Sequence, residues 1–196
     1  MLTKLEVKRQ LIHILYGLSL AALLLFNVLN KTSLLIWLGL VSLVLFLVAK
    51  KVTVPFFSSC LKHLERDAEK VGFRAKGFFF YTLGVVITVF LFDKKIALAA
   101  IMILAFGDSI SRLVGPYGYL KHPWNSSKFV EGVIVGGAIA ALTAAPFVGV
   151  IPALVAASVA MSIESLDIKI NGLKVDDNLT IPLVSAATIY LLHLVI

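Results

Sequence analysis

The sequence predicts an all-α protein: a polytopic membrane helix bundle of about seven transmembrane helices with a cytoplasmic N-terminus. Hydrophobic residues make up 60% of the 196 residues, and the mean hydropathy is +0.99. Soluble domains contain about 45–50% apolar residues. Apolar runs long enough for membrane spans recur along the whole sequence. We therefore expect a single integral membrane domain over residues 1–196, with no separate soluble domain.

Seven apolar segments account for the predicted spans. The first follows a basic start and is too long for the apolar core of a signal peptide, so we expect it to be retained as a span. The single Cys60 excludes an intrachain disulfide and a zinc cluster built on thiolates. The segments cover residues 11–29, 33–49, 77–92, 95–115, 130–148, 150–164 and 179–196.

The basic residues support this topology. With seven spans and a cytoplasmic N-terminus, 15 of the 18 Lys and Arg residues fall on the cytoplasmic side. Only Lys31, Lys94 and Lys95 lie outside, and a six-span topology would break the alternation. The same bias explains the net charge of +7 without nucleic acid as a partner. We expect these residues to face anionic headgroups or phosphates.

Two patterns concern packing. The stretch "PFFSSCLKHLERDAEKVGFRAK", residues 55–76, places apolar residues at spacings of three and four, with charged residues between them. This predicts an amphipathic helix along the cytoplasmic interface. In the fifth segment, Gly132, Gly136 and Gly137 form a small-xxx-small pattern, which predicts a close approach of helix backbones.

The stretch "ILAFGDSISRLVG", residues 103–115, places Asp108 inside a predicted span. If the span begins near Lys95, Asp108 lies roughly 20 Å from the outer face at about 1.5 Å per residue. Asp108 and Arg112 are four residues apart, so an intrahelical ion pair is the simpler interpretation. It leaves Gly107 and the nearby serines unexplained. An ionisable group at this depth therefore suggests a functional site.

The stretch "GLKVDDNLTIPL", residues 172–183, places Asp176, Asp177 and Asn178 at the cytoplasmic start of the last span. One such residue would serve as an ordinary helix N-cap. Three adjacent oxygen-bearing side chains exceed that need. Carboxylates combined with substrate phosphates are the usual ligands of Mg²⁺. We therefore predict metal or phosphate binding here.

The stretch "YGYLKHPWNSSKFVEG", residues 117–132, leads into the fifth span. Lys128 and the hydroxyls of Ser126 and Ser127 can hold phosphates beside a helix N-terminus. The alternative is a solvated loop that ends in a capped helix. Glu131 favours the functional interpretation, because it lies inside a glycine-rich membrane helix.

The stretch "KRQLIHILYG", residues 8–17, places Arg9 and His13 on one helix face. Arg9 can equally be a snorkelling anchor, and His13 a hydrogen-bonded core residue. Lys76, at the base of the third span, is a weaker candidate.

These candidates all lie toward the cytoplasmic face. A transporter would place its binding groups near the midplane, with access from both sides. Acidic groups beside basic groups on one face instead suggest a site for a magnesium–nucleoside triphosphate complex. The sequence contains neither a G-x-x-x-x-G-K-[ST] loop nor a dinucleotide-binding glycine fingerprint. The second reactant is then expected to come from the bilayer.

Four motifs, in this order, resemble the family of CTP-dependent polyprenol kinases. The motifs are "KRQLIHILYGL", "AFGDSISRLVGPYGY", "NSSKFVEG" and "VDDNLTIPL", and they cover most of the chain. The family includes dolichol kinase, phytol kinase and the CTP-dependent diacylglycerol kinase, and it is related to the phosphatidate cytidylyltransferases. The cytidylyltransferases carry a lysine–aspartate segment and a histidine–glycine–glycine, aspartate–arginine signature where this sequence has "VDDNLTIPL". The resemblance therefore implies a kinase that transfers the γ-phosphoryl group of CTP to a lipid alcohol.

The resemblance also implies roles for individual residues. Asp108, with Asp176 or Asp177 or both, is expected to bind Mg²⁺ on the CTP phosphates. The acceptor of the lipid hydroxyl proton is expected among Asp108, Asp177 and Glu131. The residues expected to bind nucleotide and phosphate are Lys128, Arg112, Ser109, Ser126, Asn178, Arg9 and Lys76.

The expected partners are CTP, a membrane lipid alcohol and the bilayer, with no nucleic acid; a homo-oligomer is left open. The expected location is a membrane with the active site toward the cytoplasm, which in a prokaryote is the plasma membrane. Two other functions remain as alternatives: a cytidylyltransferase that makes a CDP-activated lipid, and a cation-coupled membrane carrier with Asp108 as its ion site. A purely structural membrane protein is the last and least favoured alternative.

Overall fold

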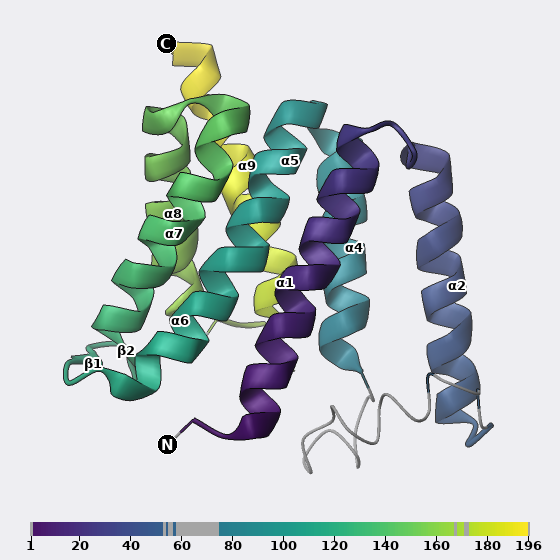
Figure 1. Cartoon of the computed structure of the whole chain (residues 1–196), viewed down its shortest axis with the longest axis horizontal. Coiled ribbons are helices and arrows are strands. Elements are labelled where there is room, and N and C mark those ends of the chain that lie inside the picture. Colours follow the sequence, from purple (N-terminus) through teal and green to yellow (C-terminus); the bar gives the residue numbers. More distant parts are fainter. Residues whose placement is uncertain are drawn as a thin grey trace.

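The computed structural model describes residues 2–52, 54, 57, 75–166, 168–170 and 173–195. Within these ranges the chain is mostly helical, as predicted, and each predicted apolar segment corresponds to one helical rod (Figure 1). Consecutive rods run in alternating directions, so the two termini lie at opposite ends of the bundle (Figure 1). The predicted amphipathic helix over 55–76 lies almost entirely outside the described residues. Six of the rods are α1 (Lys4–Leu25), α2 (Lys31–Ala49), α4 (Lys76–Leu91), α7 (Val130–Val148), α8 (Val150–Glu164) and α9 (Asp177–Val195).

The remaining rod, Lys94–Tyr117, is composed of several helix types in succession. Its core is the least solvent-exposed part of the molecule, since nearly every side chain from Ile96 to Ala105 is buried. A π-helical segment interrupts the α-helix and ends at Asp108; such wide turns occur preferentially at functional sites. The elements are α5 (Lys94–Met102), the π-helix η2 (Ile103–Asp108), α6 (Ser109–Val114) and the 3₁₀ turn η3 (Gly115–Tyr117).

Among the described residues, five helices are long and apolar enough to cross a membrane. They are α1, α2, the rod Lys94–Tyr117, α7 and α9. The other two apolar helices, α4 and α8, have 16 and 15 residues. At about 1.5 Å per residue, 15 residues span roughly 22 Å, less than the ~30 Å of a hydrocarbon core. The structure therefore supports a membrane protein, while the predicted seven spans and their orientation remain predictions.

The first helix begins earlier than its apolar pattern suggested. Thr3 caps α1 by accepting a hydrogen bond from the Glu6 N–H at 3.2 Å. The basic residues before position 11 are therefore helical rather than a flanking tail. Asn30 and Ser33 form a reciprocal capping box at the start of α2. Hydropathy locates the apolar part of a helix, whereas capping side chains locate its end.

Glycines bring α7 against the rod that carries Asp108, as the small-xxx-small pattern predicted. A Cβ on Gly132 would lie 2.6 Å from the Ser111 carbonyl oxygen, and one on Gly136 would lie 2.7 Å from the Gly107 oxygen. Gly137 differs, because its nearest neighbour is Met161 of α8 at 3.7 Å. The close approach therefore depends on Gly132 and Gly136.

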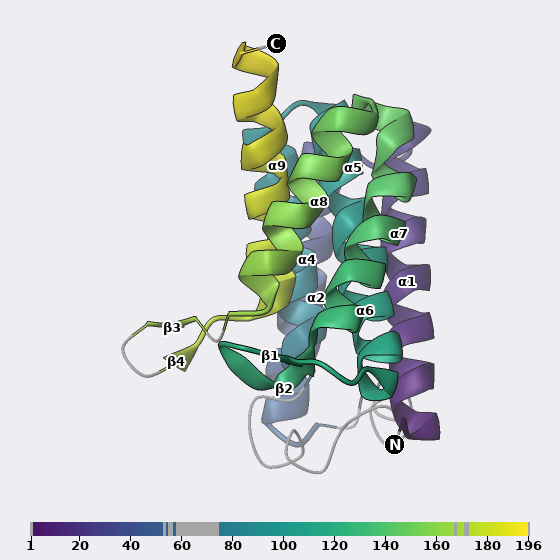
Figure 2. The ribbon, with the colours of Figure 1, turned by 90° about the vertical axis from the view of Figure 1, so that its left-hand side faces the viewer.

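Two short antiparallel hairpins, which the all-α prediction did not include, lie at the same end of the bundle as the N-terminus (Figure 2). One precedes α7, so the predicted loop "NSSKF" is a strand. The other connects α8 to α9. Residues of β2 and of β4 line the pocket described below. The strands are β1 (Lys121–His122), β2 (Asn125–Phe129), β3 (Lys169–Ile170) and β4 (Leu173–Lys174).

Candidate functional site

Asp108 ends the π-helical segment η2 and is 2% exposed. The Arg112 Nε donates to Asp108 Oδ1 at 2.7 Å, which is the predicted pair four residues apart. The pair is not isolated, because Arg112 Nη2 also donates to Asp177 Oδ2 at 3.2 Å. The other oxygen, Asp108 Oδ2, lies 3.8 Å from His13 Nε2 of α1. Asp108 is thus shared between an arginine on one side and a histidine on the other.

Asp177 and Asp176 are neighbours in the chain with different positions in the fold. Asp177 is the first residue of α9, and its side chain points to Asp108 and is 13% exposed. Asp176 precedes the helix and caps it, since its Oδ1 accepts from the Asn178 N–H at 3.2 Å and side-chain amide at 2.8 Å. The second Asp176 oxygen lies 3.8 Å from Lys76 Nζ. Asp177 therefore joins the buried carboxylates. Asp176 instead serves as the ordinary N-cap of α9.

Glu164 is a site residue that the sequence analysis did not single out. It ends α8, is 1% exposed and pairs through Oε1 with Lys128 Nζ. Lys128 also donates to the Glu164 backbone carbonyl and lies 3.9 Å from Asp177 Oδ2. Glu164 is one of two charged residues between positions 130 and 166, the other being Glu131. The argument that identified Asp108, a carboxylate inside an apolar segment, would also have identified Glu164.

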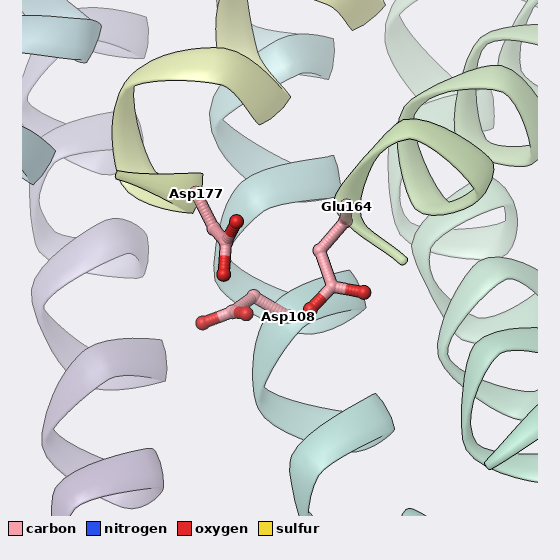
Figure 3. A group of neighbouring side chains, drawn as sticks. All are labelled: Asp108, Glu164 and Asp177. Atoms are coloured by element: carbon pink, nitrogen blue, oxygen red, sulfur yellow. The ribbon is translucent and has the colours of Figure 1, made fainter. Parts of the chain in front are cut away.

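The three carboxylates of Asp108, Glu164 and Asp177 converge from three separate helices (Figure 3). One oxygen from each lies within 4.8 Å of the others. At an effective dielectric of about 20, two unit charges 4.8 Å apart repel by roughly 3.5 kcal/mol. Arg112 and Lys128 supply two positive charges, which leaves this five-residue cluster with one net negative charge. We refer to the three acidic residues as the carboxylate triad.

The carboxylate triad has a donor set that suits Mg²⁺. Carboxylate oxygens are hard ligands, and Mg²⁺ typically takes one or two of them together with substrate phosphates. Glu164 Oε2 is buried and has no hydrogen-bond partner among the described residues. A buried, unpaired carboxylate oxygen is costly unless something outside the chain satisfies it. A divalent cation would satisfy it and offset the remaining negative charge.

A pocket of about 850 Å³ opens beside the triad at the end of the bundle that holds the N-terminus. Its charged lining residues come from α1, α6, β2, α8, β4 and α9. Pockets that bury small-molecule ligands have volumes of about 300–1,000 Å³. The charged residues in the lining are Glu6, Arg112, Lys128, Glu164, Lys174 and Asp177.

The remaining predicted site residues lie around this centre. Ser109 is buried and donates to the Gln10 carbonyl of α1 at 3.5 Å. Asn178 is also buried, and it approaches Gly77 of α4. Ser126 is exposed, whereas its neighbour Ser127 lines the pocket. Each of the three is therefore near the site without reaching the triad.

Glu131, Lys76 and Arg9 do not join the triad. The Glu131 carboxylate accepts from the Tyr119 and Leu120 N–H groups at 2.8 and 3.0 Å, so it holds the turn before β1. Lys76 pairs with Asp176 and lies over the Phe80 ring at 5.4 Å. None of the three is among the described residues that line the pocket. Glu131 therefore makes a structural contact outside the triad, and its role as a proton acceptor stays a prediction.

Comparison with known proteins shows one family relationship. The chain is similar to the uncharacterized protein MJ1137 of Methanocaldococcus jannaschii, with 32% identity over 186 residues. The match covers 92% of this chain and 91% of the archaeal protein. The chain belongs to the MJ1137 family. The similarity therefore extends over almost the whole of both chains and is not confined to one motif.

No protein-family model matches the chain, and no solved structure matches it. The name of MJ1137 states no activity.

Proposed function

We propose that the protein is a CTP-dependent lipid kinase that transfers the γ-phosphoryl group to a membrane isoprenoid alcohol, of the polyprenol, dolichol or phytol type. One observation carries the proposal: the carboxylate triad, together with Arg112 and Lys128, adjoins an 850 Å³ pocket at one end of an apolar bundle. The motif resemblance to the polyprenol kinases supports the choice of CTP and of an isoprenoid acceptor.

Phosphoryl transfer requires positioned phosphates and neutralised charge more than covalent chemistry by the protein. Asp108, Glu164 and Asp177 would hold Mg²⁺, which supplies charge neutralisation on the nucleotide phosphates when bound. Arg112 and Lys128 both line the pocket and have N–H donors directed at the triad. With nucleotide bound, the N–H donors of Arg112 and Lys128 would be available to phosphate oxygens, which accept charge-assisted hydrogen bonds.

The reaction forms a bond between the lipid oxygen and the γ-phosphorus and breaks the bond from that phosphorus to the β–γ bridging oxygen. It releases CDP and one proton. The hydroxyl proton passes to a carboxylate at the site, Asp108 or Asp177, and from there to solvent through the open pocket. Glu131 is the weakest of the predicted acceptors, since its carboxylate already accepts two backbone N–H groups.

The proposal places the protein in a membrane, with seven spans, the N-terminus inside and the pocket facing the cytoplasm. The alternating directions of the rods support this orientation, as does the excess of Lys and Arg that the seven-span topology assigns to the cytoplasmic side. The shortness of α8 supports the proposed position of the pocket, because the helix ends at Glu164. A span of that length leaves room for an aqueous pocket below the headgroup level.

The test uses purified protein in detergent with Mg²⁺, γ-labelled CTP or ATP, and separate isoprenoid alcohols and diacylglycerol. We expect label in the isoprenoid fraction with CTP, and at least a hundredfold loss in Asp108→Ala. Asp93→Asn, at the other end of the bundle, is the matched carboxylate control and should retain activity. Near-normal transfer by Asp108→Ala would reject the mechanism. Pyrophosphate release with a phosphorylated lipid would instead indicate a cytidylyltransferase, and substrate-dependent flux in sealed vesicles a carrier.

A further inference from the structure

Asp108 faces two different surroundings. Its Oδ1 is bonded to Arg112, a residue that lines the pocket. Its Oδ2 lies 3.8 Å from His13 Nε2. His13 belongs to α1 and is not among the described residues that line the pocket. A nucleotide in the pocket therefore approaches Asp108 from the Arg112 side, and the His13 side of Asp108 is left to a different reactant.

The Nε2 atom of His13 can accept a hydrogen bond, but no described residue donates one to it. Its Nε2 is buried and has no hydrogen-bond partner among the described residues, since 3.8 Å to Asp108 is too long for a hydrogen bond. In the tautomer of neutral imidazole that carries its proton on Nδ1, Nε2 has a lone pair that can accept a hydrogen bond. Buried polar atoms are normally hydrogen-bonded, so we expect a hydrogen-bond donor from another molecule at this nitrogen.

An aromatic and polar strip leads from His13 toward the outside of the bundle. The Tyr81 ring packs edge-on against His13 with centroids 4.6 Å apart, and the Tyr16 ring lies 5.1 Å beyond it. The Tyr16 hydroxyl bonds Thr82 Oγ1 at 2.8 Å and accepts from the Trp37 indole N–H at 2.9 Å. Trp37 is 38% exposed on α2, where the bundle surface is apolar. The strip therefore connects the buried Asp108 with the lipid-facing surface.

Tyr81 adds a second unsatisfied polar atom to this strip. Its hydroxyl is buried without a hydrogen-bond partner in the described parts of the chain. A Cβ on Gly17 would lie 2.2 Å from that hydroxyl, so the missing side chain at Gly17 makes room for it. Two partnerless polar atoms in an apolar bundle, His13 Nε2 and Tyr81 Oη, are more than packing requires.

We propose that His13 forms the subsite for the hydroxyl of a membrane lipid alcohol, with Nε2 accepting the hydrogen bond of that hydroxyl and the Tyr81 and Tyr16 rings lining the path of the chain. This inference rests on the proposed function and adds the side from which the lipid enters. The hydroxyl is then held beside Asp108, opposite the face that Arg112 presents to the nucleotide. A hydroxyl suits the subsite because it has a donor for Nε2, while its hydrocarbon tail suits the apolar surroundings.

The experiment compares binding of phytol with binding of phytane, the hydrocarbon of the same skeleton. Both are titrated into the purified full-length protein in detergent without nucleotide, and Mg²⁺–CTP binding is measured separately. His13→Phe retains a ring against Tyr81 but removes the acceptor, whereas His13→Gln supplies an oxygen in its place. His193→Phe, in the last turn of α9 at the other end of the bundle, is the matched control.

We expect wild type to prefer phytol by about five- to tenfold, the equivalent of one hydrogen bond. His13→Phe should bind the two ligands equally with Mg²⁺–CTP affinity unchanged, and His13→Gln should recover part of the preference. Equal binding of phytol by wild type and His13→Phe would overturn the inference. So would a parallel loss of Mg²⁺–CTP affinity, because His13 would then act through Asp108. Selective phytol binding without phosphoryl transfer would retain the subsite and reject the kinase.

Discussion

Replacement of Glu164 by Gln tests whether the carboxylate triad is a metal site or a structural charge cluster. Gln has nearly the same shape and keeps an oxygen that can accept from Lys128, so the variant removes charge without opening a cavity. The Glu164 oxygen lies within 4.8 Å of oxygens on Asp108 and Asp177. Its neutralisation therefore relieves roughly 3.5 kcal/mol of repulsion from each at that separation, at an effective dielectric of about 20.

The same change weakens the attraction to Lys128, but that ammonium retains Asp177 at 3.9 Å. The attraction that is lost acts over a shorter distance than either carboxylate repulsion, so it is about as large as the two relieved repulsions together. We therefore expect the free energy of unfolding in EDTA to change by no more than about 1 kcal/mol. This differs from the usual result for a broken buried ion pair, a loss of about 3–5 kcal/mol.

The affinity of Glu164→Gln for Mg²⁺, in contrast, should fall. Loss of one of three ligating charges should weaken binding about ten- to hundredfold, or roughly 1.4–2.7 kcal/mol. The assay is thermal denaturation of purified protein in detergent, first in EDTA and then across a series of MgCl₂ concentrations. Ligand linkage converts the Mg²⁺-dependent rise in Tm into an affinity.

Asp93→Asn is the matched control, because it also neutralises one carboxylate, at the N-cap of α5 away from the triad. It should leave the Mg²⁺-dependent rise in Tm unchanged. If Glu164→Gln behaves as this control does, the triad does not bind Mg²⁺ through Glu164. If Glu164→Gln unfolds in EDTA by several kcal/mol, the electrostatic balance described here is wrong.

Three further predictions concern the fold and its orientation. Arg112→Met leaves the buried Asp108 without its 2.7 Å partner and should lower the free energy of unfolding in denaturant by about 3–5 kcal/mol. Lys76→Met removes a side chain that is 42% exposed and should lower it by less than about 1 kcal/mol. Equal losses in the two variants would contradict the importance assigned to burial. Gly136→Ala places a Cβ 2.7 Å from a backbone oxygen and should destabilise the protein by about 1–3 kcal/mol. Gly137→Ala places a Cβ 3.7 Å from Met161 and should be neutral or stabilising in the same measurement. In a Cys60→Ser background, cysteines at Ser126 and Lys95 should be labelled by an impermeant maleimide from the cytoplasmic and outer sides respectively; labelling of both from one side would reject the seven-span topology.

The sequence alone predicted the class of protein and two of the three carboxylates of the triad, Asp108 and Asp177. Apolar runs and the distribution of Lys and Arg indicate a helical membrane bundle, because burial in hydrocarbon is a local property of composition. Asp108 stood out for the same reason, as a charge in an apolar helix. The close approach at Gly132 and Gly136 followed from residue size and spacing.

The division of roles among neighbouring residues required the tertiary structure. Asp176 and Asp177 are both acidic and adjacent, and only the direction in which α9 begins determines which one caps the helix and which one joins the triad. Glu131 appeared to be the functional carboxylate of its region. The backbone of the turn before β1 occupies it instead, and Glu164 takes the place beside Lys128.

Sequence spacing determines what lies on one helix face, and so it identified the pair of Asp108 and Arg112. It carries no information on which separate helices meet. The contacts that join His13 to Asp108 and Lys128 to Glu164 link positions 95 and 36 residues apart, and they exist because the bundle brings α1, η2, β2 and α8 together at one end. Composition thus indicated that the protein belongs in a membrane, and long-range packing decided which of its charges lie together in one cluster.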